Sequence, residues 1–161
     1  ILAFPFWAVG YLLAARRGKD MFYRFVATDL TIHFICFICF ILIPTTNIRP
    51  EIPGNTLSEK ILALVSSLDG GNSPSNLFPS IHCYVSWMCW KGVEGSEKVP
   101  KWYQRFSLVF AILIIISTQV LKQHYIVDAA VALLLVEFFW RFYQKGQRHK
   151  WVVHVFAHKK K

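Results

Sequence analysis

Long apolar runs alternate with short polar segments along the whole chain, which is the pattern of a protein that crosses a membrane several times. A helix needs about 20 apolar residues to cross the hydrocarbon core. Residues 22–43, 103–121 and 124–143 have about that length, 1–15 is too short to span alone, and 80–92 needs a tilt or a continuation. We therefore predict an all-α fold, a polytopic membrane helix bundle with about five spans.

The longest polar stretch separates the second and third spans. Pro44 ends the second span, and the segment from there to Phe78 is rich in proline, glycine, asparagine and serine, which indicates a loop outside the membrane. Within this loop, apolar residues recur at helical spacing over 57–68, and Ser58 is a candidate cap. The segment predicts a short amphipathic helix that lies on the membrane face.

The same pattern divides the chain into two parts. Residues 1–143 form the predicted transmembrane domain, and residues 144–161 form a basic cytoplasmic tail. Because the sequence begins with Ile1 inside an apolar run, we expect that an N-terminal part with the initiator methionine is missing from it.

Composition supports the membrane assignment. The chain has 55% hydrophobic and 16% aromatic residues and a mean hydropathy of +0.39, which is too apolar for an ordinary soluble domain. The net charge of +9 is common in nucleic-acid-binding proteins, but here the basic residues form short clusters between apolar runs, as in membrane loops. We therefore predict membrane lipids as partners and no nucleic acid.

The basic residues predict the orientation of the bundle. Fifteen of the eighteen lie in the first and third connections and at the C-terminal end, and the other side holds three: Arg49, Lys60 and Lys122. By the positive-inside rule, the fifteen face the cytoplasm. The long loop, the Pro79–His82 segment and His124 then all lie on the extracytoplasmic face. We predict a multi-pass integral membrane protein with its active site on that face.

Two pairs of ionisable residues lie four positions apart. If a helix begins near His124, Asp128 shares its face, accepts a hydrogen bond from one imidazole nitrogen and leaves the other as a nucleophile or base. The alternative is a histidine at the membrane edge, paired with an acid for solubility. For Asp29 and His33, we favour a polar clasp between helices and leave them out of the active site.

Candidate phosphate ligands lie on the same predicted face. The Arg49 guanidinium fits phosphate oxygens, and Ser80 with the amides of Ile81 and His82 lies at a helix start, which attracts an anion. A phosphate held there can be attacked by His124 while His82 protonates the departing oxygen. This is nucleophilic catalysis with a separate general acid, and it needs no metal ion or cofactor.

The cysteines do not change this prediction. The C-x-x-C pair has no second pair of ligands at zinc spacing and no thioredoxin-like strand pattern around it. We interpret all four as small core residues: Cys36, Cys39, Cys83 and Cys89.

Three motifs resemble those of the type 2 phosphatidic acid phosphatase superfamily of membrane lipid phosphatases and phosphotransferases. That family has Lys, six residues, Arg-Pro; then Pro-Ser-Gly-His; then Ser-Arg, five residues, His, three residues, Asp. This chain has Arg49-Pro50, Pro79-Ser80-Ile81-His82, and Ser117-Thr118 followed at the same spacing by His124 and Asp128. The resemblance covers 22–143 in order, spacing and sidedness.

The resemblance implies a six-helix bundle, of which this sequence lacks the first helix and part of the second. It also implies that His124 is the phosphorylated nucleophile, Asp128 its orienting partner and His82 the acid. Arg49 and Ser80 are then phosphate ligands.

Three positions depart from the family pattern. Leu42 replaces the lysine of the first motif, Ile81 replaces the glycine and Thr118 replaces the arginine, so two cations are absent. Lys122 is close enough in sequence to supply one charge. The altered pattern is similar to the inositol phosphorylceramide synthase-like branch, which moves a phosphoryl head group between lipids and alcohols.

We therefore expect a metal-independent enzyme that acts on a lipid phosphate or phospholipid head group through a phosphohistidine, with inositol-phosphate transfer as one candidate reaction. One alternative is a lipid phosphate or isoprenoid diphosphate phosphatase. Another is a non-catalytic membrane protein that binds lipid phosphate. The sequence does not separate hydrolysis from transfer.

Overall fold

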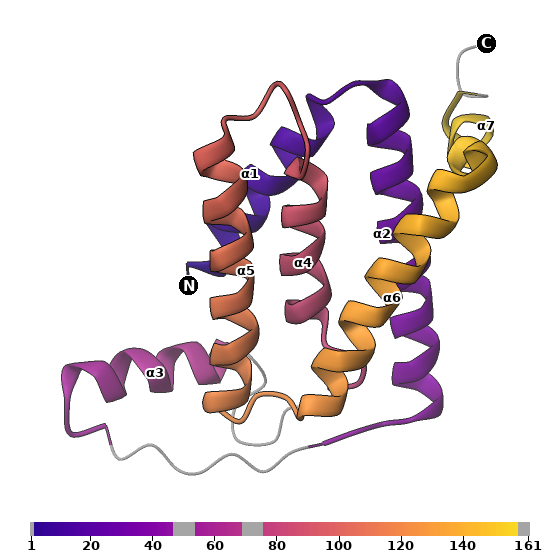
Figure 1. Cartoon of the computed structure of the whole chain (residues 1–161). Helices are drawn as coiled ribbons and strands as arrows, with labels where there is room; N and C mark the ends of the chain where they lie inside the picture. Colours follow the sequence, from indigo (N-terminus) through magenta and orange to yellow (C-terminus); the bar gives the residue numbers. More distant parts are fainter. Residues whose placement is uncertain (1, 47–53, 69–75, 158–161) are drawn as a thin grey trace.

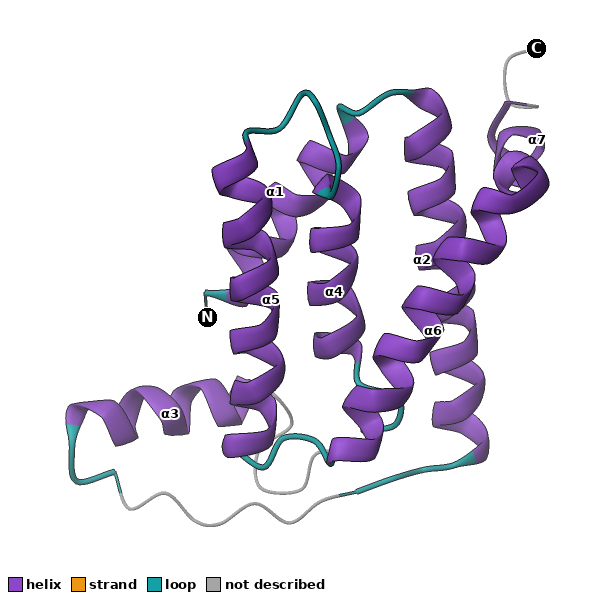
Figure 2. Cartoon of the chain, in the orientation of Figure 1, coloured by secondary structure: helices purple, strands orange, loops and turns teal. Residues whose placement is uncertain are grey.

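The computed structural model describes residues 2–46, 54–68 and 76–157, and within them the chain is helical and contains no strand (Figure 2). The all-α prediction is confirmed. In order, the elements are α1 (Ala3–Ala15), α2 (Lys19–Leu42), α3 (Leu57–Leu68), α4 (Ile81–Val93), α5 (Lys101–Val120), α6 (Ile126–Gln144), the 3-10 helix η1 (Lys145–Lys150) and α7 (Trp151–Ala157).

Helix α4 lies at the centre of the bundle, where it contacts α1, α2, α5 and α6 (Figure 1). The side chains of Cys83, Tyr84, Met88 and Cys89 are fully buried. A helix that is apolar nearly all round is stable only when it is surrounded, and the other helices provide that environment here. The first turn of α4 is thereby held at one end of the bundle.

Helices α1 and α4 approach closely at two glycines. A Cβ atom on Gly10 of α1 would lie 2.6 Å from the Sγ atom of Cys89, and one on Gly92 of α4 would lie 2.9 Å from the Cβ atom of Ala14. Each helix therefore offers a glycine where the other helix presents a side chain. Small residues at such crossings let backbones pack together, as in helix pairs of membrane proteins.

The predicted clasp at Asp29 and His33 is confirmed. Tyr11 of α1 donates its hydroxyl to Asp29 at 2.7 Å, and the Tyr84 hydroxyl of α4 is hydrogen-bonded to the His33 ring. The Asp29 and His33 side chains are 3.7 Å apart. These contacts join α1, α2 and α4 through polar groups.

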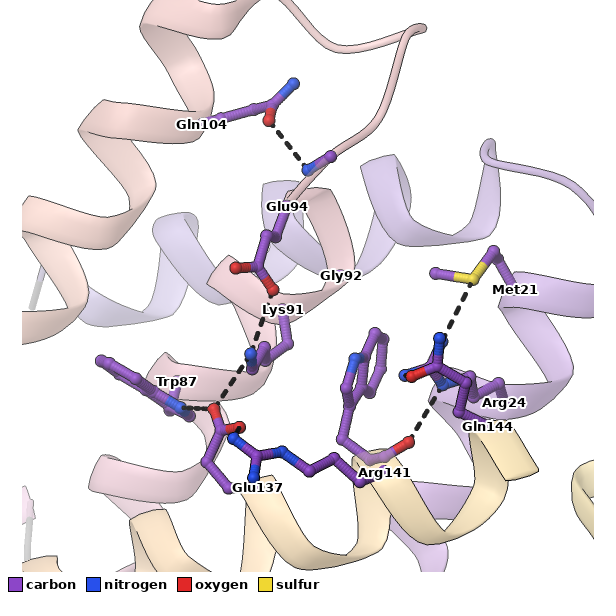
Figure 3. Close-up of polar contacts among 12 residues, drawn as sticks. Met21, Arg24, Trp87, Lys91, Gly92, Glu94, Gln104, Glu137, Arg141 and Gln144 are labelled. Atoms are coloured by element: carbon purple, nitrogen blue, oxygen red, sulfur yellow. Dashed lines mark hydrogen bonds and ion pairs between the residues drawn. The ribbon is translucent and has the colours of Figure 1, made fainter.

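A second polar cluster joins the helices at the opposite end of the bundle from the start of α4 (Figure 3). The Nζ atom of Lys91 lies 3.0 Å from carboxylate oxygens of both Glu94 and Glu137. The Nε–H of Arg24 donates to the Trp140 carbonyl at 3.1 Å, and its guanidinium lies over the Trp140 ring at 4.2 Å from the centroid. The cluster ties α2 and α4 to α6.

The expected number of spans stays a prediction. Helices α2 and α5 are long and apolar enough to cross a membrane, and α1 is a shorter apolar helix. Helix α4 has 13 residues, which extend over only about 20 Å. Helix α6 has 19 residues but carries Asp128, Glu137 and Arg141.

Of the two segments outside the predicted spans, one has more structure than the sequence pattern indicated and the other matches it. The region assigned to a basic tail forms η1 and α7, where Val152 is 1% exposed and His149 Nε2 lies 2.8 Å from the Asp20 carboxylate of α2. Helix α3 has the predicted bounds, lies near the end of α5 that leads to α6, and projects to the side of the bundle (Figure 1).

The proposed Ser58 cap is wrong. Thr56 caps α3 instead: its Oγ1 accepts the Glu59 amide at 3.2 Å, and the Glu59 carboxylate accepts the Thr56 amide at 3.1 Å.

Candidate active site

The candidate site lies where two loops lead into helices at the same end of the bundle. Residues 76–80 lead into α4, and 121–125 connect α5 to α6 (Figure 1). The amide of Ser80 donates to the Asp128 carbonyl at 3.3 Å, which joins the two helix starts directly. The structure thus brings together the Pro79–His82 segment and the segment that contains His124.

His124 is buried, with 8% of its surface exposed, and both of its ring nitrogens have close partners. Its Nδ1 atom lies 3.0 Å from the Leu77 carbonyl oxygen, and its Nε2 atom lies 3.5 Å from Nδ1 of His82. A carbonyl oxygen only accepts hydrogen bonds, so Nδ1 must carry a proton. In the neutral ring, the lone pair that can attack an electrophile is then on Nε2.

Asp128 is close to His124, but the helix geometry differs from the prediction. Helix α6 begins at Ile126 rather than at His124, so the two residues do not share a helix face. Asp128 Oδ2 accepts the Tyr125 amide at 2.9 Å in a capping box and lies 3.5 Å from His124 Nδ1. The carboxylate therefore stabilises the helix start and places a negative charge beside the ring, while the Nδ1–H of His124 donates its shorter hydrogen bond to the Leu77 carbonyl.

His82 lies in the first turn of α4 and faces His124. The centroids of the two rings are 5.7 Å apart, and the Trp7 ring of α1 lies on His82 at 5.6 Å. Trp7 is itself held by a 2.9 Å hydrogen bond from its Nε1 to the Ser86 hydroxyl. Because His124 Nε2 accepts, the hydrogen bond between the histidines requires a proton on Nδ1 of His82.

The start of α4 has the features of an anion site. Ser80 is fully buried and caps the helix by accepting the Cys83 amide at 3.3 Å, and Ile81 is the first helical residue. The amides of Ile81 and His82 belong to the first helical turn, whose N–H groups point out of the helix start. A phosphate beside His124 would meet the positive end of this helix dipole.

A groove of about 440 Å³ lies beside His82, between α1, α3 and α5. Its walls are mostly apolar, and the polar side chains among its lining residues are those of His82, Ser117, Thr118 and Gln123. The apolar lining residues are Leu2, Ala3, Phe4, Trp7, Ile61, Phe110, Leu113, Ile114 and Leu121. The groove has the composition of a site for a hydrocarbon chain, and His82 of the histidine pair is one of its lining residues.

The remaining predicted ligands lie in different surroundings. Arg49 and Pro50 lie outside the described residues. Lys122 has an exposed side chain and a φ of 51° in the turn that precedes His124. Leu42 is exposed, whereas Thr118 is buried and donates its hydroxyl to the Ile115 carbonyl at 2.8 Å. In the described part of the chain, no three His, Cys, Asp or Glu side chains could hold a metal ion together.

Sequence reasoning missed two groups that shape the site. The Leu77 carbonyl is a main-chain atom from a loop 47 residues before His124, and nothing in the side-chain pattern indicates it. Trp7 lies on α1, whose apolar run gives no sign that one of its rings contacts a histidine. The indole N–H of Trp7, one of the few side-chain polar groups on this helix, is a weak signal for it.

Comparison with known proteins gives one finding that bears on identity. No curated protein and no solved structure matches the chain significantly. A family model described as PAP2 superfamily matches residues 1–141, which is most of the chain. Members of that superfamily are typically membrane proteins and are generally phosphatases. The chain therefore belongs to the PAP2 superfamily, that of the type 2 phosphatidic acid phosphatases.

Proposed function

We propose that this protein is an integral membrane enzyme that removes or transfers the phosphoryl head group of a lipid through a phosphohistidine at His124. The observation that carries the proposal is the 3.5 Å approach of His124 Nε2 to Nδ1 of His82 at the start of α4. A nucleophile, an acid and an anion-binding helix start are the groups that phosphoryl transfer without a metal ion requires.

The proposed reaction has two steps. In the first, the Nε2 lone pair of His124 attacks phosphorus, the bond from phosphorus to the lipid oxygen breaks, and His82, as the doubly protonated imidazolium, gives one proton to that oxygen and becomes neutral. In the second, water or an alcohol attacks the phosphohistidine, its proton passes to His82, and the bond between phosphorus and Nε2 breaks. Asp128 and the Leu77 carbonyl stabilise the positive charge that the His124 ring carries after attack.

Substrate binding must separate the two rings. In an in-line displacement, phosphorus lies between the attacking nitrogen and the leaving oxygen, and the acid lies beyond that oxygen. A gap of 3.5 Å between the ring nitrogens is too short for this arrangement. We infer that the phosphate enters beside His124 and that the His82 ring turns toward the groove, where the lipid oxygen would lie.

Two surface features support a lipid substrate and a location in the membrane. The groove beside His82 offers an apolar path for an alkyl chain. The outer faces of α2, α5 and α6 expose large apolar side chains, an arrangement expected of helices in contact with lipid. Examples are Phe34, Phe37 and Ile41 on α2, Val109, Ile116 and Val120 on α5, and Leu134 and Phe138 on α6.

The missing family cations favour transfer from a phosphodiester. A phosphomonoester carries about two negative charges at neutral pH, because its second pKa is near 6, whereas a diester carries one. Leu42 and Thr118 occupy the two family cation positions and are both neutral. With Arg49 and Lys122 as the candidate cations, the site matches a monoanion better. The proposed reaction is transfer of a phospholipid head group to an alcohol, with water as a competing acceptor.

Activity assays of the purified protein in detergent test the proposal. Phosphatidylinositol and phosphatidic acid are offered separately, with and without ceramide, and with a chelator of divalent cations. We expect transfer from the diester, little hydrolysis of the monoester, full activity with the chelator and no activity in His124→Ala. His154→Ala, an exposed histidine on α7, is the matched control and retains activity.

Three results would count against parts of this account. Efficient cleavage of phosphatidic acid without transfer to any added alcohol would leave a lipid phosphatase. A need for a divalent cation would exclude the metal-independent mechanism. Tight binding of lipid phosphates without turnover would indicate the non-catalytic alternative.

A further inference from the structure

Thr45 lies just after α2 and holds the loop that leads into α4. Its Oγ1 atom accepts two hydrogen bonds, from the Leu77 amide at 2.9 Å and from the Phe78 amide at 3.1 Å. Its main-chain carbonyl accepts the Asn76 amide at 2.9 Å. One residue thus satisfies three consecutive main-chain donors of this loop.

The second of these bonds acts on the peptide group that contacts His124. The Phe78 N–H and the Leu77 C=O belong to one planar peptide unit. In a trans peptide the two groups point in opposite directions, so a unit whose N–H is fixed on one side has its C=O fixed on the other. Thr45 Oγ1 holds the N–H side, and His124 Nδ1 lies 3.0 Å from the oxygen on the C=O side.

We propose that Thr45 is a positioning residue that selects the Nδ1–H tautomer of His124 and so directs Nε2 toward His82. Thr45 does so through the Leu77–Phe78 peptide unit, without contact with the substrate. Its effect on turnover rests on the proposed function, whereas its effect on the tautomer does not.

Thr45→Val removes the acceptor and keeps the shape of the side chain. Two amides then lose their acceptor, and the peptide unit can turn to satisfy them. We expect kcat to fall roughly ten- to hundredfold, as for a displaced catalytic group, with KM nearly unchanged. Thr45→Ser keeps the hydroxyl and restores kcat. Thr46→Val, in the adjacent exposed threonine, is the matched control and leaves kcat as in the wild type.

The direct test is nitrogen NMR of the full chain in detergent, with ¹⁵N-labelled histidine rings. The signal of His124 is identified by its loss in His124→Ala. In the neutral ring we expect a protonated Nδ1 and an unprotonated Nε2 in the wild type and in Thr45→Ser, and a mixture of both tautomers in Thr45→Val. A Thr45→Val protein whose His124 signal still reports only the Nδ1–H tautomer would overturn the proposal.

The thermal unfolding midpoint of each variant shows whether it is folded. If Thr45→Val does not fold, Thr45→Ala and Thr45→Ser replace it as the pair without and with the hydroxyl. A shift of the tautomer in a protein that forms no phosphohistidine would support the role of Thr45 and contradict the proposed function. Failure of the proposed role of Thr45 can therefore be distinguished from failure of the proposed function.

Discussion

Nε2 of His124 lies 3.5 Å from Nδ1 of His82, although 42 residues separate the two in sequence. The Leu77 carbonyl fixes the proton of His124 on the other nitrogen, so the contact is made by the atom that would attack phosphorus. This places the two histidines in different chemical roles. His124 presents a lone pair, and His82 presents a proton.

This difference between the histidines predicts that the effect of replacing His82 depends on the leaving group of the substrate. His82→Ala should slow turnover of a lipid substrate by roughly a hundredfold or more, because an alkoxide leaves poorly without a proton. An aryl phosphate, whose leaving group is a weak base, should lose much less. Steady-state rates on both substrates give the comparison.

The control for this comparison is His124→Ala, which should abolish turnover of both substrates. Equal losses of lipid and aryl phosphate turnover in His82→Ala would deny His82 the role of the acid.

Asp128 has two functions that substitution can separate. Asp128→Asn retains an acceptor for the Tyr125 amide, so the start of α6 should stay capped while the negative charge beside His124 is lost. We expect little change in the unfolding midpoint and a lower rate of phosphoenzyme formation. Asp128→Ala should lower the rate of phosphoenzyme formation and also lower stability by about 1 kcal/mol. Single-turnover kinetics measure the rate of phosphoenzyme formation, and thermal unfolding in detergent measures stability. A wild-type rate in Asp128→Asn would show that the charge has no part in catalysis.

The helices could be predicted from sequence because apolar runs and their breakers carry strong signals. The predicted spans 22–43 and 103–121 correspond to α2 and α5 within a few residues at each end, and 57–68 matches α3. Helix α7 could not be predicted this way. Among its described side chains, Val152 is deeply buried, within a basic segment that has the pattern of a solvated tail.

The site was predictable only as far as side chains reveal it. His82, His124 and Asp128 were identified because ionisable residues are rare and costly in apolar surroundings. The Leu77 carbonyl was not, since every residue has one and only the fold brings this oxygen to the ring. Thr45 was missed for a related reason: its hydroxyl acts on main-chain amides from another loop, and threonine is unremarkable in a polar segment.

The groove predicts a substrate-dependent effect of side-chain size. Leu113 of α5 lines the groove, so Leu113→Trp should reduce the space for an alkyl chain. We expect a higher KM for long-chain lipids and little change for a short-chain analogue. Leu134→Trp is the matched control, because Leu134 is exposed on α6 and does not line the groove. Equal KM values for the wild type and Leu113→Trp on long-chain lipids would exclude the groove as the chain site.

The close approach of α1 to α4 predicts that a larger residue at the crossing lowers stability. A Cβ atom at Gly10 would lie 2.6 Å from Cys89 Sγ, so Gly10→Ala must push the helices apart or move the cysteine. The cost of such overpacking is about 1–3 kcal/mol. Ala8→Val, at an exposed position of the same helix, should leave the unfolding midpoint in detergent nearly unchanged. A midpoint for Gly10→Ala equal to that of the wild type would contradict the tight crossing.

The central claim is that His124 forms a covalent bond to phosphorus, and the most direct test is to trap that bond. The protein is mixed briefly with a lipid labelled with ³²P in its phosphate, quenched in alkali, where phosphohistidine is stable, and digested for mass spectrometry. We expect one labelled peptide, with the phosphoryl group on Nε2 of His124, and no label in His124→Ala. Label on His82 or on any other residue, or rapid turnover with no labelled protein under any quench, would contradict it.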